Sequence, residues 1–335
     1  MRMSRRQALA GLGGLAALRL AGGNIMAQEA TPAATGEWTF TDDAGKTVTL
    51  PQAPRRIVAD LNAATALWDF GVRPEAVSGW TVATDAAWGN VDRATPNITA
   101  NAGAPEPNIE KLLEIKPDLF VTVTWGPEEE SGEAPYAWSF LDDESYQRVN
   151  EIVPVIGISA AGLADQNMAR YAELAALLGA DLETPELQEA KATYDERVAR
   201  FKEIAQEKAD LTTLFASANG ETIYVANPVD WADLAWYRTL GLNILDPEAE
   251  RWAYWEELSA EQAGKYRPDI LFQSQRQGSF TQDELQAHPL YKTLPAIAAG
   301  QVAPWNQDFI QSYQGLGSAL GTMIEALENA EKVTD

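Results

Sequence analysis

The chain has 335 residues, of which 46% are hydrophobic and 22% charged, and it contains no cysteine and one histidine, His288. This length suits one large or two ordinary domains, and the apolar fraction is too high for a disordered chain. The formal net charge of -24 argues against binding to nucleic acid or to anionic lipid headgroups. The lack of cysteine excludes disulfides, thiolate metal sites and cysteine nucleophiles, and a single histidine excludes most histidine-based catalysis.

Residues 1–27 are typical of an export signal, with a basic start, an Ala/Leu/Gly-rich stretch and Ala27 as a small residue for cleavage. The segment SRRQAL is similar to a twin-arginine signal, although Ala8 stands where a Phe is usual. No Cys follows it, which excludes a bacterial lipoprotein anchor, and residues 28–37 are typical of a flexible tether. We therefore expect a periplasmic or secreted protein. The alternative interpretation of residues 1–27 is a basic N-terminal helix of the folded domain.

Residues 38–182 alternate between strand and helix patterns and predict a first lobe. The lobe opens with WTFTDDAGKTVTLP, in which a turn at Asp43 to Gly45 separates two alternating segments of a hairpin. Further along, IEKLLEIKPDLFVTVT predicts a short helix that ends before Pro117, followed by a buried strand. Alternation of this kind favours a parallel sheet flanked by helices.

The stretch from Glu183 to Lys208 predicts a single long amphipathic helix, because its apolar residues recur at steps of three, four or seven. Thr184 followed by Pro185 is typical of an N-cap with proline at the first helical position. Such a helix has two interpretations: a surface helix of one domain, or a spacer between two lobes.

Residues 209–335 repeat the order of the first lobe, which favours the spacer. Glu110 stands seven residues before Pro117-Asp118, and Glu261 stands seven residues before Pro268-Asp269. Each Pro-Asp pair leads into a strand. We therefore predict an α/β fold of two related lobes with parallel-rich sheets flanked by helices, joined by one long α-helix. A single larger sheet is the alternative, and a last helix, residues 311–331, is expected to pack back on a lobe or the hinge.

Several segments in this order resemble one family: WTFTDDAGKTVTLPQAPRRIV, PNIEKLLEIKPDLFV, ELSAEQAGKYRPDILF and LPAIAAGQVAPW. They are similar to the extracytoplasmic substrate-binding proteins of iron-siderophore, haem and cobalamin ABC importers. The resemblance implies two α/β lobes joined by one long helix, a ligand held between them and a small closing motion. It also implies that Glu110 and Glu261 dock onto a membrane permease, which works with a cytoplasmic ATPase. The alternative for both residues is a helix-capping role.

In open α/β sheets, ligands bind at the carboxyl ends of the strands, which selects candidate contacts in the loops that follow them. These candidates are Asn62, Trp80, Trp125, Asn227, Arg276, Trp305 and Phe309. An aromatic site suits a flat or apolar ligand, such as a siderophore complex or a macrocycle. Arg276 suits an anionic ferric chelate or a carboxylate, and the alternative is an ordinary surface arginine. The acids Glu128 to Glu130 are expected to form a solvated rim, with a preference for a cationic complex as the alternative.

Other functions remain as alternatives. Haem or cobalamin fits the same fold, with Tyr224 or Tyr313 as an iron ligand for haem. With only His288, the sequence lacks the clustered histidines of zinc- or manganese-binding relatives, and no protein metal site or cofactor is expected. A secreted hydrolase lacks support because no G-x-S-x-G motif occurs. A permease-free sensor module is the remaining alternative. We expect a monomer that is not an enzyme and does not bind nucleic acid.

Overall fold

The computed structural model describes residues 36–79, 85–94, 107–125, 136, 139–140 and 142–334. The predicted export signal, most of the predicted tether and Trp80 lie outside these residues. The residues from Ala33 onward form one compact unit. Among the described helices, none is long and apolar enough to cross a membrane.

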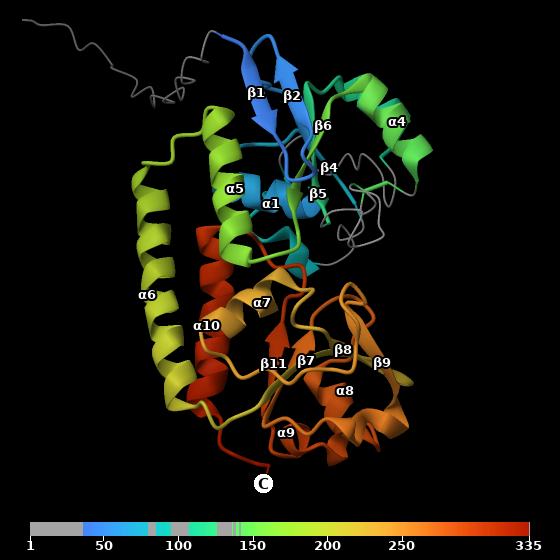
Figure 1. The fold of residues 1–335 in the computed structure, drawn as a ribbon, viewed down its shortest axis with the longest axis vertical. Coiled ribbons are helices and arrows are strands. Elements are labelled where there is room, and N and C mark those ends of the chain that lie inside the picture. The colour runs from blue at the N-terminus through green and yellow to red at the C-terminus, as the bar shows by residue number, and fades with distance from the viewer. Residues whose placement is uncertain are drawn as a thin grey trace, which may run out of the picture. The chain divides into compact units, whose positions relative to one another are not determined.

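The first lobe contains a four-stranded parallel sheet in the order β4-β3-β5-β6 (Figure 1). Its central strand β5, LFVTVT, is buried along its whole length, as expected for a parallel strand covered on both faces. The predicted hairpin is present as two antiparallel strands, β1 and β2. The elements are β1 (Trp38–Thr41), β2 (Thr47–Leu50), β3 (Ile57–Asp60), α1 (Leu61–Asp69), β4 (Ala76–Ser78), η2 (Asp85–Trp88), α2 (Ile109–Ile115), β5 (Leu119–Thr124), α4 (Asp143–Ile152), β6 (Val155–Ser159) and α5 (Ala164–Leu177).

The second lobe contains a five-stranded sheet in the order β11-β10-β7-β8-β9. Strand β10 is parallel to both of its neighbours, whereas β8 is antiparallel to β7 and β9, so this sheet is mixed. The elements are β7 (Thr213–Ala218), β8 (Thr222–Ala226), α7 (Ala232–Thr239), β9 (Trp255–Ser259), η3 (Ala260–Lys265), β10 (Ile270–Ser274), α8 (Gln282–Ala287), η4 (Tyr291–Thr293), α9 (Pro295–Ala298), β11 (Val302–Trp305) and α10 (Tyr313–Asn329).

The repeated Pro-Asp pairs occupy equivalent places in the two sheets. In the first lobe, Asp118 accepts hydrogen bonds from the backbone amides of Arg55 and Arg56, each at 2.9 Å. In the second lobe, Asp269 accepts one from the amide of Thr212 at 2.8 Å. Each aspartate therefore holds the chain that enters the neighbouring strand. The predicted two-lobe α/β fold is confirmed.

Helix α6 (Pro185–Glu207) lies in the chain between the two sheets and begins at the predicted cap, where Thr184 Oγ1 accepts from the amide of Leu187. Helix α10 runs along α6 (Figure 1). The two helices are joined by hydrogen bonds from Arg197 Nη1 to the carbonyl of Gly317, at 2.7 Å, and from Arg200 Nη2 to Glu328, at 2.7 Å. The last helix thus packs along the interlobe helix.

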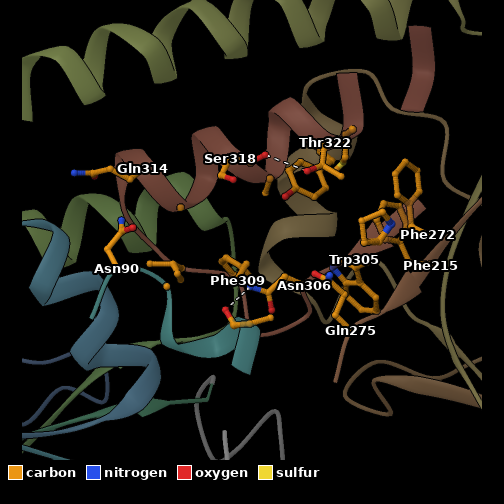
Figure 2. A pocket seen from close by; sticks show the side chains of 18 residues that line it. Asn90, Phe215, Phe272, Gln275, Trp305, Asn306, Phe309, Gln314, Ser318 and Thr322 are labelled. Carbon is orange, nitrogen blue, oxygen red and sulfur yellow. Dashed lines mark hydrogen bonds between the residues drawn. The ribbon is translucent and has the colours of Figure 1, made fainter. Parts of the chain in front are cut away.

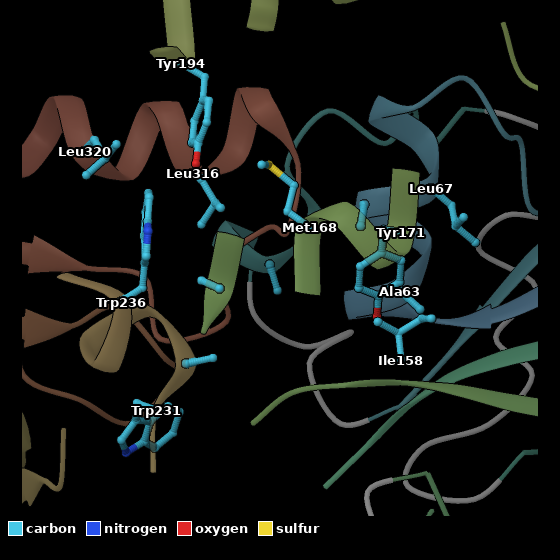
Figure 3. Packing of buried hydrophobic residues seen from close by; sticks show 14 of the residues in the cluster. Ala63, Leu67, Ile158, Met168, Tyr171, Tyr194, Trp231, Trp236, Leu316 and Leu320 are labelled. Atoms are coloured by element: carbon cyan, nitrogen blue, oxygen red, sulfur yellow. The ribbon is translucent and has the colours of Figure 1, made fainter. Parts of the chain in front are cut away.

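The largest apolar cluster draws on both lobes (Figure 3). Met168 and Tyr171 belong to α5 of the first lobe, and Trp236 belongs to α7 of the second lobe. Tyr194 of α6 stacks on Trp236 with ring centroids 6.1 Å apart. The two lobes therefore share a continuous core beside the long helices, while smaller clusters cover the outer faces of the two sheets.

Candidate functional site

A cavity of about 530 Å³ lies between the first lobe, the strand ends of the second lobe and helix α10 (Figure 2). The first lobe contributes Ala86 of η2 and the two residues that follow this short helix. The described lining residues are Ala86, Gly89, Asn90, Phe215, Tyr237, Phe272, Gln275, Pro304, Trp305, Asn306, Phe309, Ile310, Gln314, Gly315, Ser318, Ala319, Thr322 and Met323. A volume of this size is typical of small-molecule sites.

The described lining of the cavity combines aromatic rings with neutral polar groups, and it includes no Asp, Glu, Lys or Arg. Amides come from Asn90, Gln275, Asn306 and Gln314, and hydroxyls come from α10 (Figure 2). The Gln314 Oε1 atom is buried and has no hydrogen-bond partner among the described residues. Such a lining can hold an apolar ligand and fix its orientation by a few hydrogen bonds.

The two lobes approach each other closely at this cavity. Asn306 Nδ2 donates to the carbonyl oxygen of Ala86 across the lobes at 3.4 Å. Gly89 has φ +49°, and a Cβ atom at this position would lie 2.1 Å from Ile310 Cδ1. Glycine therefore allows the first lobe to contact the loop after β11.

A cluster of aromatic rings continues from Trp305, away from the cavity lining. Trp231 packs edge-to-face against Trp305, Trp255 and Tyr254, with centroid distances of 5.3, 4.9 and 5.8 Å. Trp125, which follows β5 in the first lobe, packs against Tyr254 of the second lobe at 5.2 Å. Aromatic residues from both lobes therefore meet at the ends of the strands.

The indole of Trp305 is held by a buried acid. Trp305 Nε1 donates to Asp233 Oδ2 at 2.8 Å, and both side chains are buried. Burial raises the pKa of Asp233 to about 7, although the hydrogen bond from Trp305 lowers it. This contact fixes the ring plane of Trp305 between the cavity and the aromatic cluster.

An ion pair between Arg276 and Asp308 stands beside the cavity, next to the lining residues Gln275 and Phe309. Arg276 Nε donates to Asp308 Oδ2 at 3.1 Å, and a second, shorter contact joins Nη2 to Oδ1, so the pairing is bidentate. The side-chain amide of Gln307 is oriented so that both its nitrogen and its oxygen form hydrogen bonds. The nitrogen donates to Ser274 Oγ, and the oxygen accepts from Arg276 Nη1 at 2.7 Å. Asp308 is buried, while the Arg276 side chain keeps 32% exposure.

Asp60 ends strand β3 in the first lobe and is fully buried. Its Oδ1 accepts from the amide of Asn62 at 2.9 Å, at the start of α1. Burial raises the pKa of Asp60 to about 7 against the effect of that hydrogen bond, and the charge of Asp308 adds to the rise. The carboxylates of the two lobes are therefore close enough to repel each other.

The structure separates the residues predicted to bind ligand into groups. Trp305 and Phe309 line the cavity, Arg276 forms the ion pair beside it, and Trp125 belongs to the aromatic cluster. Asn62 lies in the first turn of α1, and Trp80 lies outside the described residues.

Asn227 holds a loop instead of facing the cavity. Its side-chain amide donates to Asp230 Oδ2 at 2.9 Å and to the carbonyl of Glu250 at 3.1 Å. Asp230 in turn accepts from the amides of Trp252 and Tyr254. Asn227 therefore positions the segment that carries Tyr254.

Sequence reasoning missed several polar residues at the site, among them Asp60, Asn90, Asp308 and Gln314. The position of Asp308 beside Phe309, after a predicted strand, was the one available signal for it. Asn90 and Gln314 are brought to the cavity by tertiary packing alone.

Glu110 and Glu261 both lie exposed in the first turn of a short helix, α2 and η3 respectively. Asn108 caps α2 by accepting from the amide of Lys111 at 3.0 Å, and Ser259 forms a capping box at η3. The backbone hydrogen bond at Glu261 lowers the pKa of its carboxyl, and a bond from Ser259 adds to this. Both carboxylates are therefore presented at equivalent places of the two lobes.

A resident protein metal centre has no support in the described part of the chain, where no group of three or more His, Asp or Glu side chains could hold a metal ion. A ligand that carries its own metal needs no such centre.

Residues 50–309 match the model of the periplasmic binding protein family. The match covers more than half of the chain, so the chain belongs to this family. It is also similar to the Fe(3+)-citrate-binding protein YfmC of Bacillus subtilis, with 24% identity over 83% of this chain and 81% of that protein.

Solved structures with the same fold include siderophore-binding proteins. The crystal structure of DesE, a ferric-siderophore receptor protein from Streptomyces coelicolor, matches with a TM-score of 0.78 and 30% identity, over 89% of this chain and all of that one. The petrobactin-binding protein YclQ from Bacillus subtilis matches with a TM-score of 0.65 and 17% identity, over 88% of this chain and 99% of that one. The latter similarity concerns the fold alone.

Proposed function

We propose that this protein is the extracytoplasmic solute-binding component of an ABC importer and captures a ferric siderophore-type chelate between its lobes. The observation that carries the proposal is the interlobe site itself: a cavity lined by both lobes, continued by an aromatic cluster that joins Trp125 to Tyr254. Similarity to a ferric-siderophore receptor and to a ferric-citrate-binding protein supports iron chelates as the ligand class.

The aromatic content of the site provides a direct binding assay. Trp305 lines the cavity and Trp125 belongs to the aromatic cluster that continues from it, so a bound ferric complex will quench their fluorescence. We would titrate the mature protein with ferric hydroxamate, ferric catecholate, ferric citrate, haem and cobalamin. Sub-micromolar quenching by a ferric chelate is expected. Binding of haem or cobalamin alone would replace the siderophore class by a macrocycle, and no response to any ligand would refute the proposal.

A matched variant ties the signal to the site. Trp305→Phe removes an indole from the cavity and leaves Asp233 without its donor, so ligand affinity should fall by roughly tenfold or more. Trp38→Phe removes a buried indole from the first-lobe hairpin, remote from the strand ends, and should leave affinity unchanged.

Delivery to a permease is the second half of the proposal. The exposed carboxylates of Glu110 and Glu261 lie at equivalent places of the two lobes and suit docking onto basic pockets of a membrane partner. The double variant Glu110→Ala/Glu261→Ala should lose transport while ligand affinity stays the same.

A double variant of other exposed acids, Glu114→Ala in α2 and Glu257→Ala in β9, changes the net charge equally and should keep transport. Lost ligand affinity in the Glu110/Glu261 variant, or equal loss of transport in both double variants, would contradict the docking role. A permease-free sensor would tolerate both.

A further inference from the structure

The charge distribution at the interlobe site bears on the class of ligand. Arg276 stands next to the described cavity lining, since it follows Gln275 directly. Its guanidinium forms a bidentate pair with the buried carboxylate of Asp308 and also contacts Gln307. The positive charge of Arg276 is therefore largely compensated before any ligand arrives.

A second carboxylate shifts the balance further toward negative charge. Asp60 is buried at the end of β3 in the first lobe. Burial raises its pKa most, and the negative charge of Asp308 in the second lobe raises the pKa further. Its described hydrogen-bond donors are the amide of Asn62 at 2.9 Å and the hydroxyl of Ser139 at 3.5 Å, which carry no net charge. The three groups thus comprise one cation and two acids, of which Asp60 is only partly ionised near neutral pH because its pKa is raised to about 7.

Another arginine near the aromatic cluster is also committed to an acid. Arg251 stacks over Trp252 and its Nε lies 3.6 Å from Asp230 Oδ1, whose side chain is buried. Asp230 holds the backbone of the loop that carries Tyr254. Arg251 therefore compensates an existing charge.

The overall charge of the chain acts in the same direction. Its formal net charge of -24 produces a long-range field that repels polyanions.

We infer that the interlobe site selects ferric chelates of neutral or positive net charge, of the hydroxamate type, over polyanionic catecholate or carboxylate complexes. This inference rests on the proposed function. A ferric tris-hydroxamate is neutral and becomes cationic when its chain carries a free amine, whereas a ferric tris-catecholate is trianionic. The neutral amides and rings of the cavity suit the former, and the described lining of the cavity offers the latter no Lys or Arg to pair with.

The test uses three linear ferric tris-hydroxamates with the same iron coordination. One carries a terminal ammonium, one is N-acetylated and neutral, and one is N-succinylated and anionic. The ammonium form should bind more tightly than the succinyl form by on the order of tenfold at low salt, and the ratio should shrink as salt rises. Equal affinity of the ammonium and succinyl forms would overturn the inference.

Variants of the ion pair separate its charge from its packing. Asp308→Asn leaves the charge of Arg276 uncompensated and should reduce the preference for the ammonium form severalfold. The double variant Arg276→Gln/Asp308→Asn keeps the pair neutral and should retain the preference for the ammonium form. It provides a second measurement if the single variant does not fold. The control is Asp246→Asn, which changes the net charge by the same amount as Asp308→Asn. It removes the ion-pair partner of Arg238 in α7 and should retain the preference for the ammonium form.

The outcomes distinguish the inference from the proposed function. Binding of ferric catecholate or ferric citrate in preference to all three hydroxamates would refute the charge selection while the chelate-binding function stands. Equal shifts in Asp308→Asn and Asp246→Asn would show that overall charge, not the ion pair, sets the preference. Failure of every ferric chelate to bind would refute the proposed function.

Discussion

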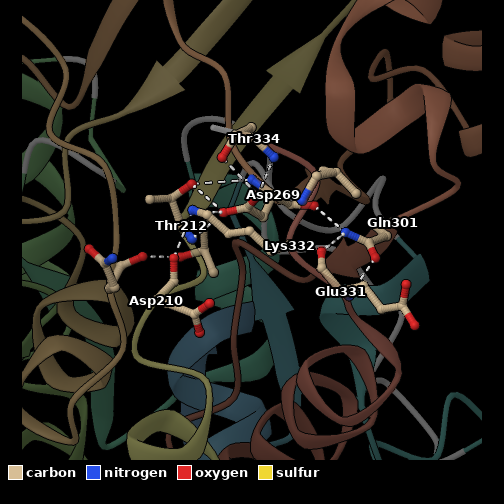
Figure 4. A network of polar contacts seen from close by, with 10 residues as sticks. Asp210, Thr212, Asp269, Gln301, Glu331, Lys332 and Thr334 are labelled. Carbon is tan, nitrogen blue, oxygen red and sulfur yellow. Dashed lines mark hydrogen bonds and ion pairs between the residues drawn. The ribbon is translucent and has the colours of Figure 1, made fainter.

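The carboxylate of Asp269 holds the C-terminal tail onto the second lobe (Figure 4). It is fully buried and accepts from the amide and hydroxyl of Thr212, at 2.8 and 3.0 Å. From the tail it accepts from Lys332 Nζ, at 3.0 Å, the amides of Val333 and Thr334, each at 2.9 Å, and the Thr334 hydroxyl, at 2.8 Å. Asp269→Asn would remove the charge that all six donors share and point an amide N–H₂ at some of them.

We estimate the cost from the ion pair and the donors left behind. Lys332 keeps 38% exposure and can turn to water, so most of the cost comes from the buried donors that an amide cannot satisfy, about 3 kcal/mol. For a chain of this size, 1 kcal/mol corresponds to roughly 2 °C in melting temperature, so Asp269→Asn should melt about 6 °C lower at neutral pH.

The pH dependence of unfolding gives an independent check. Burial raises the pKa of Asp269, but the hydrogen bonds from Thr212, Val333, Lys332 and Thr334 outweigh this and hold the pKa well below its ordinary value. A carboxyl with a depressed pKa contributes stability above its unfolded pKa of about 4 and loses it as the pH falls toward the folded value. The melting temperature of Asp269→Asn should therefore fall less steeply below pH 4 than that of the wild type.

Circular dichroism melts at pH 7 and pH 3 measure both effects. The matched control is Asp118→Asn, the repeat equivalent in the first lobe, which is exposed and accepts from the two amides of Arg55 and Arg56. We expect a loss of about 1 kcal/mol there. Equal melting shifts for the two variants, or a shift below about 2 °C for Asp269→Asn, would refute the reasoning.

Three further variants test other features of the fold. Ser312→Ala removes the cap of α10 and the 2.5 Å hydrogen bond to Asp69 of α1, so chemical denaturation should show a loss of about 2 kcal/mol. Asp60→Asn should be more stable than the wild type above pH 7 and similar to it near pH 4. The pKa of Asp60 is raised in the folded protein, so the wild type loses stability as the pH rises toward about 7. A parallel pH profile of the two melting temperatures would contradict this. Gly79→Ala should lower the melting temperature more than Gly45→Ala: both glycines have positive φ, but a Cβ at Gly79 would lie 2.1 Å from Asp60 Oδ2, whereas Gly45 faces open space.

The sequence predicted those parts of the fold that depend on local chemistry. The long helix was predicted for Glu183 to Lys208 and runs over Pro185–Glu207, because a Thr-Pro start and an amphipathic period are local signals. The direction of β8 could not be predicted. Residues 222–226 favour a strand in either direction, and the antiparallel pairing with β7 and β9 is decided by neighbours distant in the chain.

The candidate site was only partly predictable for the same reason. The strand-end rule indicated Trp305 and Phe309, which line the cavity, because their place follows from chain order. It could not show that Asp308 pairs with Arg276, since both are charged residues that sequence reasoning assigns to the surface. Burial of Asp60 depends on Gly79 and Ser139 packing over it, which no local pattern records.

Helix α10 changes what the long helix α6 implies about lobe movement. If α6 were the only contact between the lobes, only the stiffness of this helix would limit their separation. Instead, α10 packs along α6, and its cap Ser312 bonds to Asp69 of the first lobe. Helix α5 of the first lobe also contacts α7 of the second, within the shared apolar core. Opening the lobes widely would expose large rings such as Trp236, at about 2 kcal/mol for each, so binding must use a largely preformed site.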